Sequence, residues 1–232
     1  MPHNELPIRM VCATRFSADQ FLSDTLLGKS IQSFIEISSV EIRLSADNST
    51  GLSEIYNQAI DASIDNPAIL VFAHDDRLFC DFFWAERIRD GLENFDIAGL
   101  AGNIRRAPKQ PSWNFADDQF TWDTPSNFSG TVVHGSTFPL NRVLPFGAVG
   151  QECKLLDGLL LAVKSDTLIN SKLRFDENFK FHFYDLDFCR EAELKSLTMG
   201  TIPLSVVHKS GGSFSSDEWS NAYQKYLAKW KD

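Results

Sequence analysis

The sequence predicts an α/β fold in which helices flank a mixed, mainly parallel sheet. From residue 8 to residue 104, apolar segments with strand-forming residues alternate with segments whose apolar residues recur at helical spacing. The composition is that of a globular chain, because 43% of its 232 residues are hydrophobic and 23% are charged. Alternating strands and helices are typical of parallel sheets, which bind their ligands beyond the carboxyl ends of the strands.

The elements of this first part follow in a clear order. Residues 8–13 are predicted to form a buried strand, and residues 40–44 a strand that ends in a turn at Asp47. Residues 68–73 and 96–104 are the next two strands. A helix precedes each of them, with apolar residues on one face: Leu52, Ile55, Tyr56, Ala59 and Ile60 in the first, and Phe82, Ala85, Ile88 and Leu92 in the second.

Residues 105–150 interrupt the alternation. Their beginning is rich in Pro, Trp, Asp and Ser and has no clear period, which predicts a long loop or a small hairpin insertion. One domain, residues 1–232, accounts for the chain, with a half on either side of the insertion (1–104 and 151–232).

Regular structure resumes after the insertion. We expect a strand at 154–163, a helix that ends at Gly200 and a strand at 201–208. The last helix is predicted to begin at a capping box of Ser215 and Glu218. It carries an aromatic stripe at helical spacing: Trp219, Tyr223, Tyr226 and Trp230.

Charge and cysteine usage narrow the function classes. A net charge of −9 argues against a general nucleic-acid binder, which needs basic surface to displace counterions from phosphates. An anionic substrate requires a metal ion or a local basic group. Four widely spaced cysteines without a C-x-x-C pair predict buried thiols in a reducing compartment. With no signal-peptide pattern and no apolar segment long enough to cross a bilayer, we expect a cytoplasmic protein, and peripheral attachment at the inner face of the membrane stays open.

Polar residues directly after the strand 68–73 are the first candidates for chemistry. Asp75 and Asp76 are adjacent carboxylates at a strand end, and a divalent cation such as Mg²⁺ or Mn²⁺ would relieve their mutual repulsion. The alternative is an ordinary solvated turn. His208 also ends an apolar strand and is a second candidate ligand, although a lone histidine is more often structural.

A second candidate group is the segment HFYDLDF, which contains His182, Asp185 and Asp187 at a predicted loop-to-helix boundary. One of these aspartates could serve as the N-cap of the helix. A cap explains both aspartates less well, because they lie among aromatic residues. Burial beside aromatic rings would raise the pKa of a carboxyl toward that of a useful general base.

Four segments, in order along the chain, resemble motifs of GT-A-type glycosyltransferases, in particular the bacterial inverting enzymes of family 2 and their relatives. They are SADNST with the helix after it, VFAHDD at the place of the D-x-D metal motif, LLDGLLLAV, and the segment from FHFYDLDF to VVHKSGGS, which is similar to the ED-x-D helix and the H-x-S-G-G strand. The resemblance covers most of the chain. It implies a single GT-A-type domain with a Rossmann-like nucleotide-binding half and an acceptor-binding half.

The resemblance also implies a nucleotide-sugar site near the end of the first strand. Asp47 would contact a uracil-type base, and Asp75 would lie near the ribose. Asp76 and His208 would bind a Mn²⁺ or Mg²⁺ ion that offsets the charge of the donor diphosphate. The implied nucleotide-sugar-binding residues are Ala13, Thr14, Asp47, Asn57, Asp75, Asp157 and Gly158.

Asp185 stands at the position of the catalytic aspartate in this family and would deprotonate the acceptor hydroxyl. Asp187 would be a supporting residue, and it is the alternative base. The sequence departs from the family pattern at two positions. His74 replaces the first acidic residue of the D-x-D triplet, and Tyr184 replaces the glutamate before the catalytic aspartate.

These assignments imply a metal-dependent glycosyltransferase that moves a sugar from a UDP- or dTDP-linked donor to a hydroxyl of a glycan or lipid-linked acceptor, with inversion, in polysaccharide or glycoconjugate synthesis. Trp113 and Trp122 would stack on the acceptor or form a lid, or else pack as a small core. One alternative is a binding module of the same fold that has lost turnover. A second is a sugar-phosphate nucleotidylyltransferase, which needs a glycine-rich loop after the first strand, whereas CATRFSADQF contains no glycine.

Overall fold

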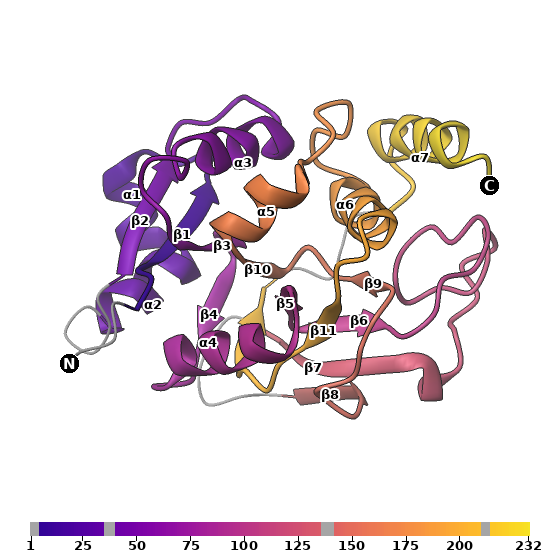
Figure 1. Cartoon of the computed structure of the whole chain (residues 1–232), viewed down its shortest axis with the longest axis horizontal. Coiled ribbons are helices and arrows are strands. Elements are labelled where there is room, and N and C mark those ends of the chain that lie inside the picture. The colour runs from indigo at the N-terminus through magenta and orange to yellow at the C-terminus, as the bar shows by residue number, and fades with distance from the viewer. Residues whose placement is uncertain (1–4, 35–39, 136–141, 210–213) are drawn as a thin grey trace.

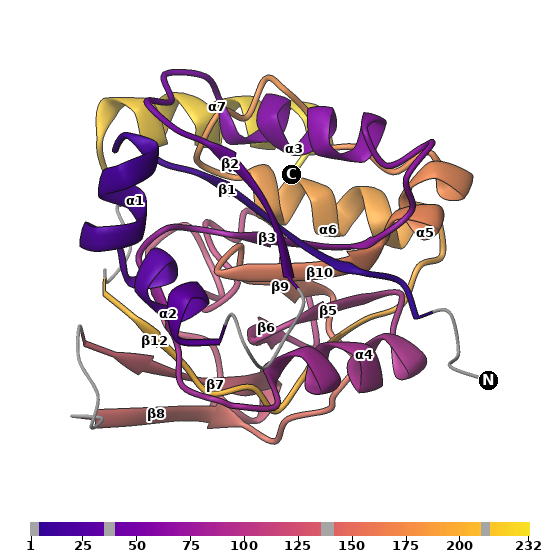
Figure 2. The same cartoon turned by 90° about the vertical axis from the view of Figure 1, so that its left-hand side faces the viewer.

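The computed structural model describes residues 5–34, 40–135, 142–209 and 214–232. Within these residues the strands form two sheets of six strands each. Helices cover both faces of the first sheet, and the second sheet lies beside it (Figures 1 and 2).

The first sheet has the strand order β11-β5-β10-β3-β1-β2. All of its strands run in the same direction except β10, which is antiparallel to both of its neighbours. The prediction of a mixed, mainly parallel sheet flanked by helices is therefore confirmed. Because β10 lies between β3 and β5, both halves of the chain contribute to this sheet. Its strands are β1 (Ile8–Ala13), β2 (Val40–Ser45), β3 (Ile69–Ala73), β5 (Ile97–Gly99), β10 (Leu160–Lys164) and β11 (Met199–Thr201).

The two faces of the first sheet carry separate hydrophobic cores. Side chains alternate along each strand, so that Leu70 and Phe72 of β3 enter one core, while Ile69 and Val71 enter the other. Helices α3, α5 and α6 cover the first of these faces, and α2 and α4 cover the second (Figure 2). The helices are α1 (Ala18–Asp24), α2 (Leu26–Phe34), α3 (Leu52–Asp61), α4 (Trp84–Asn94), α5 (Ser165–Ser171), α6 (Tyr184–Leu194) and α7 (Asp217–Trp230).

Two segments that the sequence presents as single strands each serve both sheets. Residues 96–104 divide at Leu100 into β5 and β6, and residues 154–163 divide at Asp157 and Gly158 into β9 and β10. The prediction of one strand was wrong in both cases, because a continuous apolar run does not show where the chain passes from one buried sheet to another. The second sheet has the order β4-β12-β7-β6-β9, with β8 paired to β7. Its strands are β4 (Arg77–Phe79), β6 (Ala101–Asn103), β7 (Phe128–His134), β8 (Arg142–Gly147), β9 (Leu155–Leu156) and β12 (Val206–His208).

The insertion predicted at 105–150 contains both a loop and a hairpin. A loop with a single 3₁₀ turn at Pro125–Asn127 leads into β7, which pairs with β8 in antiparallel register. Residues 136–141 of the predicted insertion lie outside the described residues. The hairpin is part of the second sheet, so this segment adds a wall to the molecule rather than a free loop.

Three other expectations need correction. Two helices, α1 and α2, lie between the first two strands, where the sequence predicted no element. Gly200 lies in β11 and does not end the preceding helix, which stops earlier, where Ser196 takes the left-handed conformation with a φ of 57°. The last helix is capped by Ser216, whose hydroxyl accepts a hydrogen bond from the Trp219 N–H, and not by Ser215.

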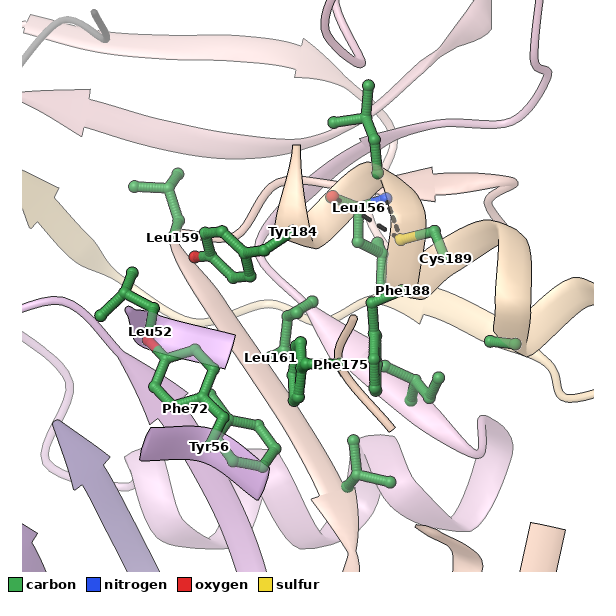
Figure 3. Close-up of a cluster of buried hydrophobic side chains, with 14 of the residues drawn as sticks. Leu52, Tyr56, Phe72, Leu156, Leu159, Leu161, Phe175, Tyr184, Phe188 and Cys189 are labelled. Carbon is green, nitrogen blue, oxygen red and sulfur yellow. Dashed lines mark hydrogen bonds between the residues drawn. The ribbon is translucent and has the colours of Figure 1, made fainter. Parts of the chain in front are cut away.

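Figure 3 shows the buried cluster where α3 and α6 meet the first sheet. The rings of Phe175 and Phe188 stack with their centroids 4.1 Å apart, and Tyr56 packs edge-on against Phe175 at 5.1 Å. Tyr184, the first residue of α6, lies on the side of the cluster next to Leu159 (Figure 3). The aromatic packing therefore fixes the start of α6, which carries the predicted catalytic aspartates. In the described ranges, no helix combines the length and hydropathy that crossing a bilayer requires.

Candidate active site

The loops after three parallel strands are joined at one edge of the first sheet. The Asp47 N–H, after β2, donates a hydrogen bond to the Phe16 carbonyl, and Asp47 itself has a positive φ of 48°. The hydroxyl of Thr14, which follows Ala13 at the end of β1, donates to Oδ2 of Asp75 after β3 at 2.5 Å. These contacts place Asp47 and Asp75 after the carboxyl ends of parallel strands of one sheet, the edge at which such sheets bind their ligands.

A cavity of about 510 Å³ lies next to this edge. His74, which directly precedes Asp75, is part of its lining, so the edge and the cavity adjoin. Both sheets, the loop before β7 and the start of α6 contribute to the walls. The polar lining residues are His74, Arg77, Ser112, Asn114, His134, Asp157, His182, Asp185 and His208, and the aromatic ones are Trp113, Phe115, Trp122, Phe146, Phe181, Phe183, Tyr184, Phe214 and Trp219.

A chain of hydrogen bonds crosses the floor of the cavity. The Tyr184 hydroxyl donates to the Gly158 carbonyl at 2.9 Å and lies 2.8 Å from Nε2 of His74. Because the single phenolic proton is used by Gly158, Nε2 of His74 is the donor to Tyr184. Nδ1 of His74 then accepts from Nη2 of Arg77 at 3.3 Å. Burial and the charge of Arg77 lower the pKa of His74 to about 3, so this ring is neutral.

Asp76 is in contact with two basic side chains. Nη1 of Arg77 donates to its Oδ1, and Nε2 of His208 lies 3.5 Å from its Oδ2. Burial alone would raise the pKa of Asp76, but the hydrogen bond from His208 and the charge of Arg77 outweigh it and hold the pKa well below its usual range. The structure therefore brings together the two predicted metal ligands, with a guanidinium already against one of them.

The turn between β9 and β10 meets the first turn of α6 at the cavity. The Gly158 N–H donates to Oδ2 of Asp185 at 2.9 Å, and the Leu186 N–H donates to Oδ1 at 2.9 Å. Gly158 is required here because a Cβ would lie 2.2 Å from the Tyr184 hydroxyl oxygen. Asp157, beside it, accepts a bond from the indole N–H of Trp113 at 2.6 Å.

The pKa of Asp185 is raised well above that of an ordinary aspartate. Burial raises its pKa most, the nearby charge of Asp157 raises it further, and the two backbone bonds only partly oppose these effects. The resulting pKa is about 7. A carboxylate with such a pKa is ionised often enough to accept a proton near neutral pH and basic enough to hold it.

Asp187 is fully buried and does not line the cavity. Its carboxylate accepts hydrogen bonds from Nζ of Lys229 at 3.0 Å and from the indole N–H of Trp230 at 2.9 Å. Burial raises its pKa to about 6, against the opposing effect of Lys229. Asp187 therefore anchors α7 to α6, and of the two candidate bases only Asp185 faces the cavity.

Asn57 does not line the cavity. The Asn57 amide donates to the Phe175 carbonyl and to Oε1 of Glu177, both at 2.9 Å, and its oxygen accepts from the Phe175 N–H at 3.0 Å. Both ends of the side chain thus hold the loop before α6. This contact set gives Asn57 a structural role in the described chain.

The two tryptophans of the insertion differ. Trp113 is buried, packs edge-on against Phe128 and Phe146, and uses its N–H on Asp157. Trp122 is 59% exposed and also lines the cavity. The small-core alternative thus describes Trp113, whereas Trp122 has a ring face open to a ligand.

Several site residues were not found from the sequence. Arg77 directly follows Asp75 and Asp76, and this position was the only sequence feature that could have indicated a role in the site. His134, whose ring lies 5.6 Å from that of His208, and Phe181, which stacks on His74 at 5.7 Å, carry no motif.

Comparison with solved structures identifies the fold. The chain is similar to GalNAc-T7, crystallised with UDP, GalNAc and Mn²⁺, with a TM-score of 0.54 and 9% identity over 97% of this chain. The fold is that of the GT-A glycosyltransferases. The chain is also similar to TarS of S. aureus, with a TM-score of 0.52 and 10% identity over 97% of this chain. Its similarity to A197 from STIV has a TM-score of 0.50 and 11% identity, and covers 92% of this chain and 87% of the A197 chain.

The GT-A likeness is one of structure alone. The chain spans 48% of the length of the GalNAc-T7 chain and 39% of that of TarS. No protein-family model matches the sequence, and no curated protein matches it.

The residues present do not fit the divalent metal site that the GT-A likeness suggests. In the described part of the chain, no three His, Cys, Asp or Glu side chains come together as a metal-binding group. Asp75 is bonded to Thr14, and one oxygen of Asp76 is bonded to Arg77. A buried guanidinium occupies a ligand oxygen and repels a second cation, so this arrangement is unfavourable for Mn²⁺ or Mg²⁺.

Proposed function

We propose that the chain is a glycosyltransferase that moves a sugar from a UDP- or dTDP-linked donor to an acceptor hydroxyl with inversion, in polysaccharide or glycoconjugate synthesis. One observation carries the proposal. Asp185 lies on the wall of a cavity in a GT-A fold and has a pKa of about 7, and the same cavity borders the sheet edge where Thr14 is bonded to Asp75. A base and a nucleotide-binding edge are the two parts that direct displacement at an anomeric carbon needs.

The chemistry follows from the position of Asp185. Its carboxylate accepts the proton of the acceptor hydroxyl as the oxygen attacks the anomeric carbon on the face opposite the leaving group. The bond from the anomeric carbon to the phosphate oxygen breaks, and the nucleoside diphosphate leaves with the electron pair. The proton then passes from the Asp185 carboxyl to solvent. The hydrogen bonds from the Gly158 and Leu186 N–H groups hold both carboxylate oxygens in place during these steps.

The two ends of the site suit the two substrates. The joined loops after β1, β2 and β3 would hold the nucleoside, and the UDP in the GalNAc-T7 structure supports a nucleotide of this kind. Much of the cavity wall is aromatic, and the exposed ring of Trp122 offers an apolar surface to a sugar of a glycan or lipid-linked acceptor.

A screen of UDP- and dTDP-sugars tests the proposal. At least one should raise the Tm in a concentration-dependent way and be slowly hydrolysed to free nucleotide. Asp185→Asn should keep the Tm shift and lose hydrolysis, while Asp166→Asn, an exposed aspartate on α5, should keep both. Binding without turnover would identify a binding module, and the absence of both binding and turnover for every nucleotide sugar would contradict the proposal.

A further inference from the structure

Arg77 is a cation built into the site beside Asp76. It is the first residue of β4, and in the antiparallel pairing with β12 it stands opposite His208. Only 3% of the residue is exposed, yet it contributes to the lining of the cavity. A buried arginine is uncommon unless it is paired and hydrogen-bonded, so its contacts indicate what it does.

Three contacts fix the guanidinium. Nε donates to the Leu159 carbonyl at 3.4 Å, Nη1 donates to Asp76, and Nη2 donates to Nδ1 of His74 at 3.3 Å. These contacts use three of the five N–H donors of a guanidinium. In the described residues the other two N–H groups have no protein acceptor, and the guanidinium borders the cavity. A fixed, charged fork with donors to spare is suited to the oxygens of a phosphate.

The two departures from the family pattern support this fork. His74 stands where the resemblance predicts a carboxylate, and Tyr184 stands where it predicts a glutamate. The two side chains are hydrogen-bonded to each other, and His74 accepts from Arg77. Both replacements remove a negative charge that would attract a divalent cation. What they leave in place is a neutral support for the guanidinium.

Acidic and histidine side chains from several elements lie near the guanidinium. Asp76 and Asp157 are the acidic groups near Arg77, and Nδ1 of His74 accepts a hydrogen bond from it. His208 of β12 lies 3.5 Å from the other carboxylate oxygen of Asp76, and the ring of His134 of β7 lies 5.6 Å from that of His208. A diphosphate that enters the cavity meets a guanidinium with two N–H groups that have no acceptor in the described residues.

We propose that the Arg77 guanidinium, and not a bound divalent cation, binds the diphosphate of the donor through its two remaining N–H groups. This inference rests on the proposed function and deepens it. Arg77 would stabilise the negative charge that develops on the departing nucleoside diphosphate. The chain would then differ from a GT-A protein such as the Mn²⁺-bound GalNAc-T7 in how it meets that charge.

Calorimetric titration of the whole chain with UDP and with dTDP tests the proposal, in EDTA and in Mn²⁺. We expect one of the two nucleotides to bind in EDTA with a Kd within about twofold of that in Mn²⁺, since the cation is part of the protein. Arg77→Gln should weaken binding at least about tenfold, in line with the loss of a charged hydrogen bond. Arg77→Lys should retain part of the affinity, because it keeps the charge without the fork.

Arg87→Gln is the matched control, because Arg87 pairs with Asp81 at the surface and lies outside the cavity. Circular dichroism and Tm establish that each variant is folded. The comparison of EDTA with Mn²⁺ uses the unchanged chain and holds even if Arg77→Gln does not fold. Binding that requires Mn²⁺, or binding that Arg77→Gln leaves unchanged, overturns the proposal. Binding of neither nucleotide under either condition instead contradicts the proposed function.

Discussion

Replacing Asp185 by asparagine should make the stability of the protein less sensitive to pH. The Asp185 carboxyl has its ordinary pKa of 3.8 in the unfolded chain and a pKa of about 7 in the folded protein. Because the folded state holds this proton more tightly, the associated stability is fully present below pH 3.8 and is lost as the pH rises to about 7. Asp185→Asn has no such proton to lose.

The size of the effect follows from the two pKa values. Their difference of about three pH units corresponds to about 4 kcal/mol at 1.36 kcal/mol per unit. Asp185 is partly accessible through the cavity, and solvent screening lowers the expected value to about 2–4 kcal/mol. The variant also loses one of two backbone hydrogen bonds to this side chain, but that loss is the same at every pH.

Urea unfolding of both proteins at several pH values between 4 and 9 measures the effect. The free energy of unfolding of Asp185→Asn, relative to that of the unchanged chain, should rise by about 2–4 kcal/mol from pH 4 to pH 8 and stay level above that. A difference that stays constant over this range would mean that burial and Asp157 do not perturb Asp185. The assignment of this carboxylate as a base tuned to neutral pH would then be wrong.

Three further predictions follow from the same contacts. Asp157→Asn removes a charge that raises the pKa of Asp185, so the midpoint of the pH–rate profile for nucleotide release should move below pH 7; an unchanged midpoint contradicts this coupling. Lys229→Met leaves the buried Asp187 without its cation and should lower the free energy of unfolding by about 3 kcal/mol in urea at pH 8. The loss should be smaller at pH 5, where Asp187 is largely protonated. An equal loss at both pH values counts against the buried pair. Tyr184→Phe removes a hydroxyl with two hydrogen bonds and should lower the free energy of unfolding by about 1–3 kcal/mol, and a neutral result would show that these bonds are not formed.

The first sheet was predictable from the sequence because its central strands are buried on both faces. Short apolar runs such as residues 8–13 and 68–73 are typical of strands that are covered on both faces of a sheet. The second sheet was not predictable as a separate sheet, since β6, β9 and β12 have two or three residues each and lie inside segments that the sequence presents as longer strands. Residues 154–163 illustrate the limit, because the turn at Gly158 that builds the site lies inside an apolar run.

The site was predictable in its residue types but not in its pairings. Asp185 and Asp187 are two positions apart on a helix, so they face different directions and only one can reach a given cavity. Which of them does so is decided by Lys229 and Trp230, more than forty residues later in the chain. Arg77 was missed for the same reason. Its role depends on contacts across the fold that no local pattern records.

The pH dependence of donor hydrolysis, with water as the acceptor, tests the central claim most directly. For the nucleotide sugar selected by binding, the rate of nucleotide release should rise with pH to a plateau, with a midpoint near 7, as Asp185 ionises. Asp185→Asn should lower the plateau by a factor of about 10² to 10⁴. A rate that is independent of pH between 5 and 9, or that Asp185→Asn leaves unchanged, would contradict the assignment of Asp185 as the catalytic base.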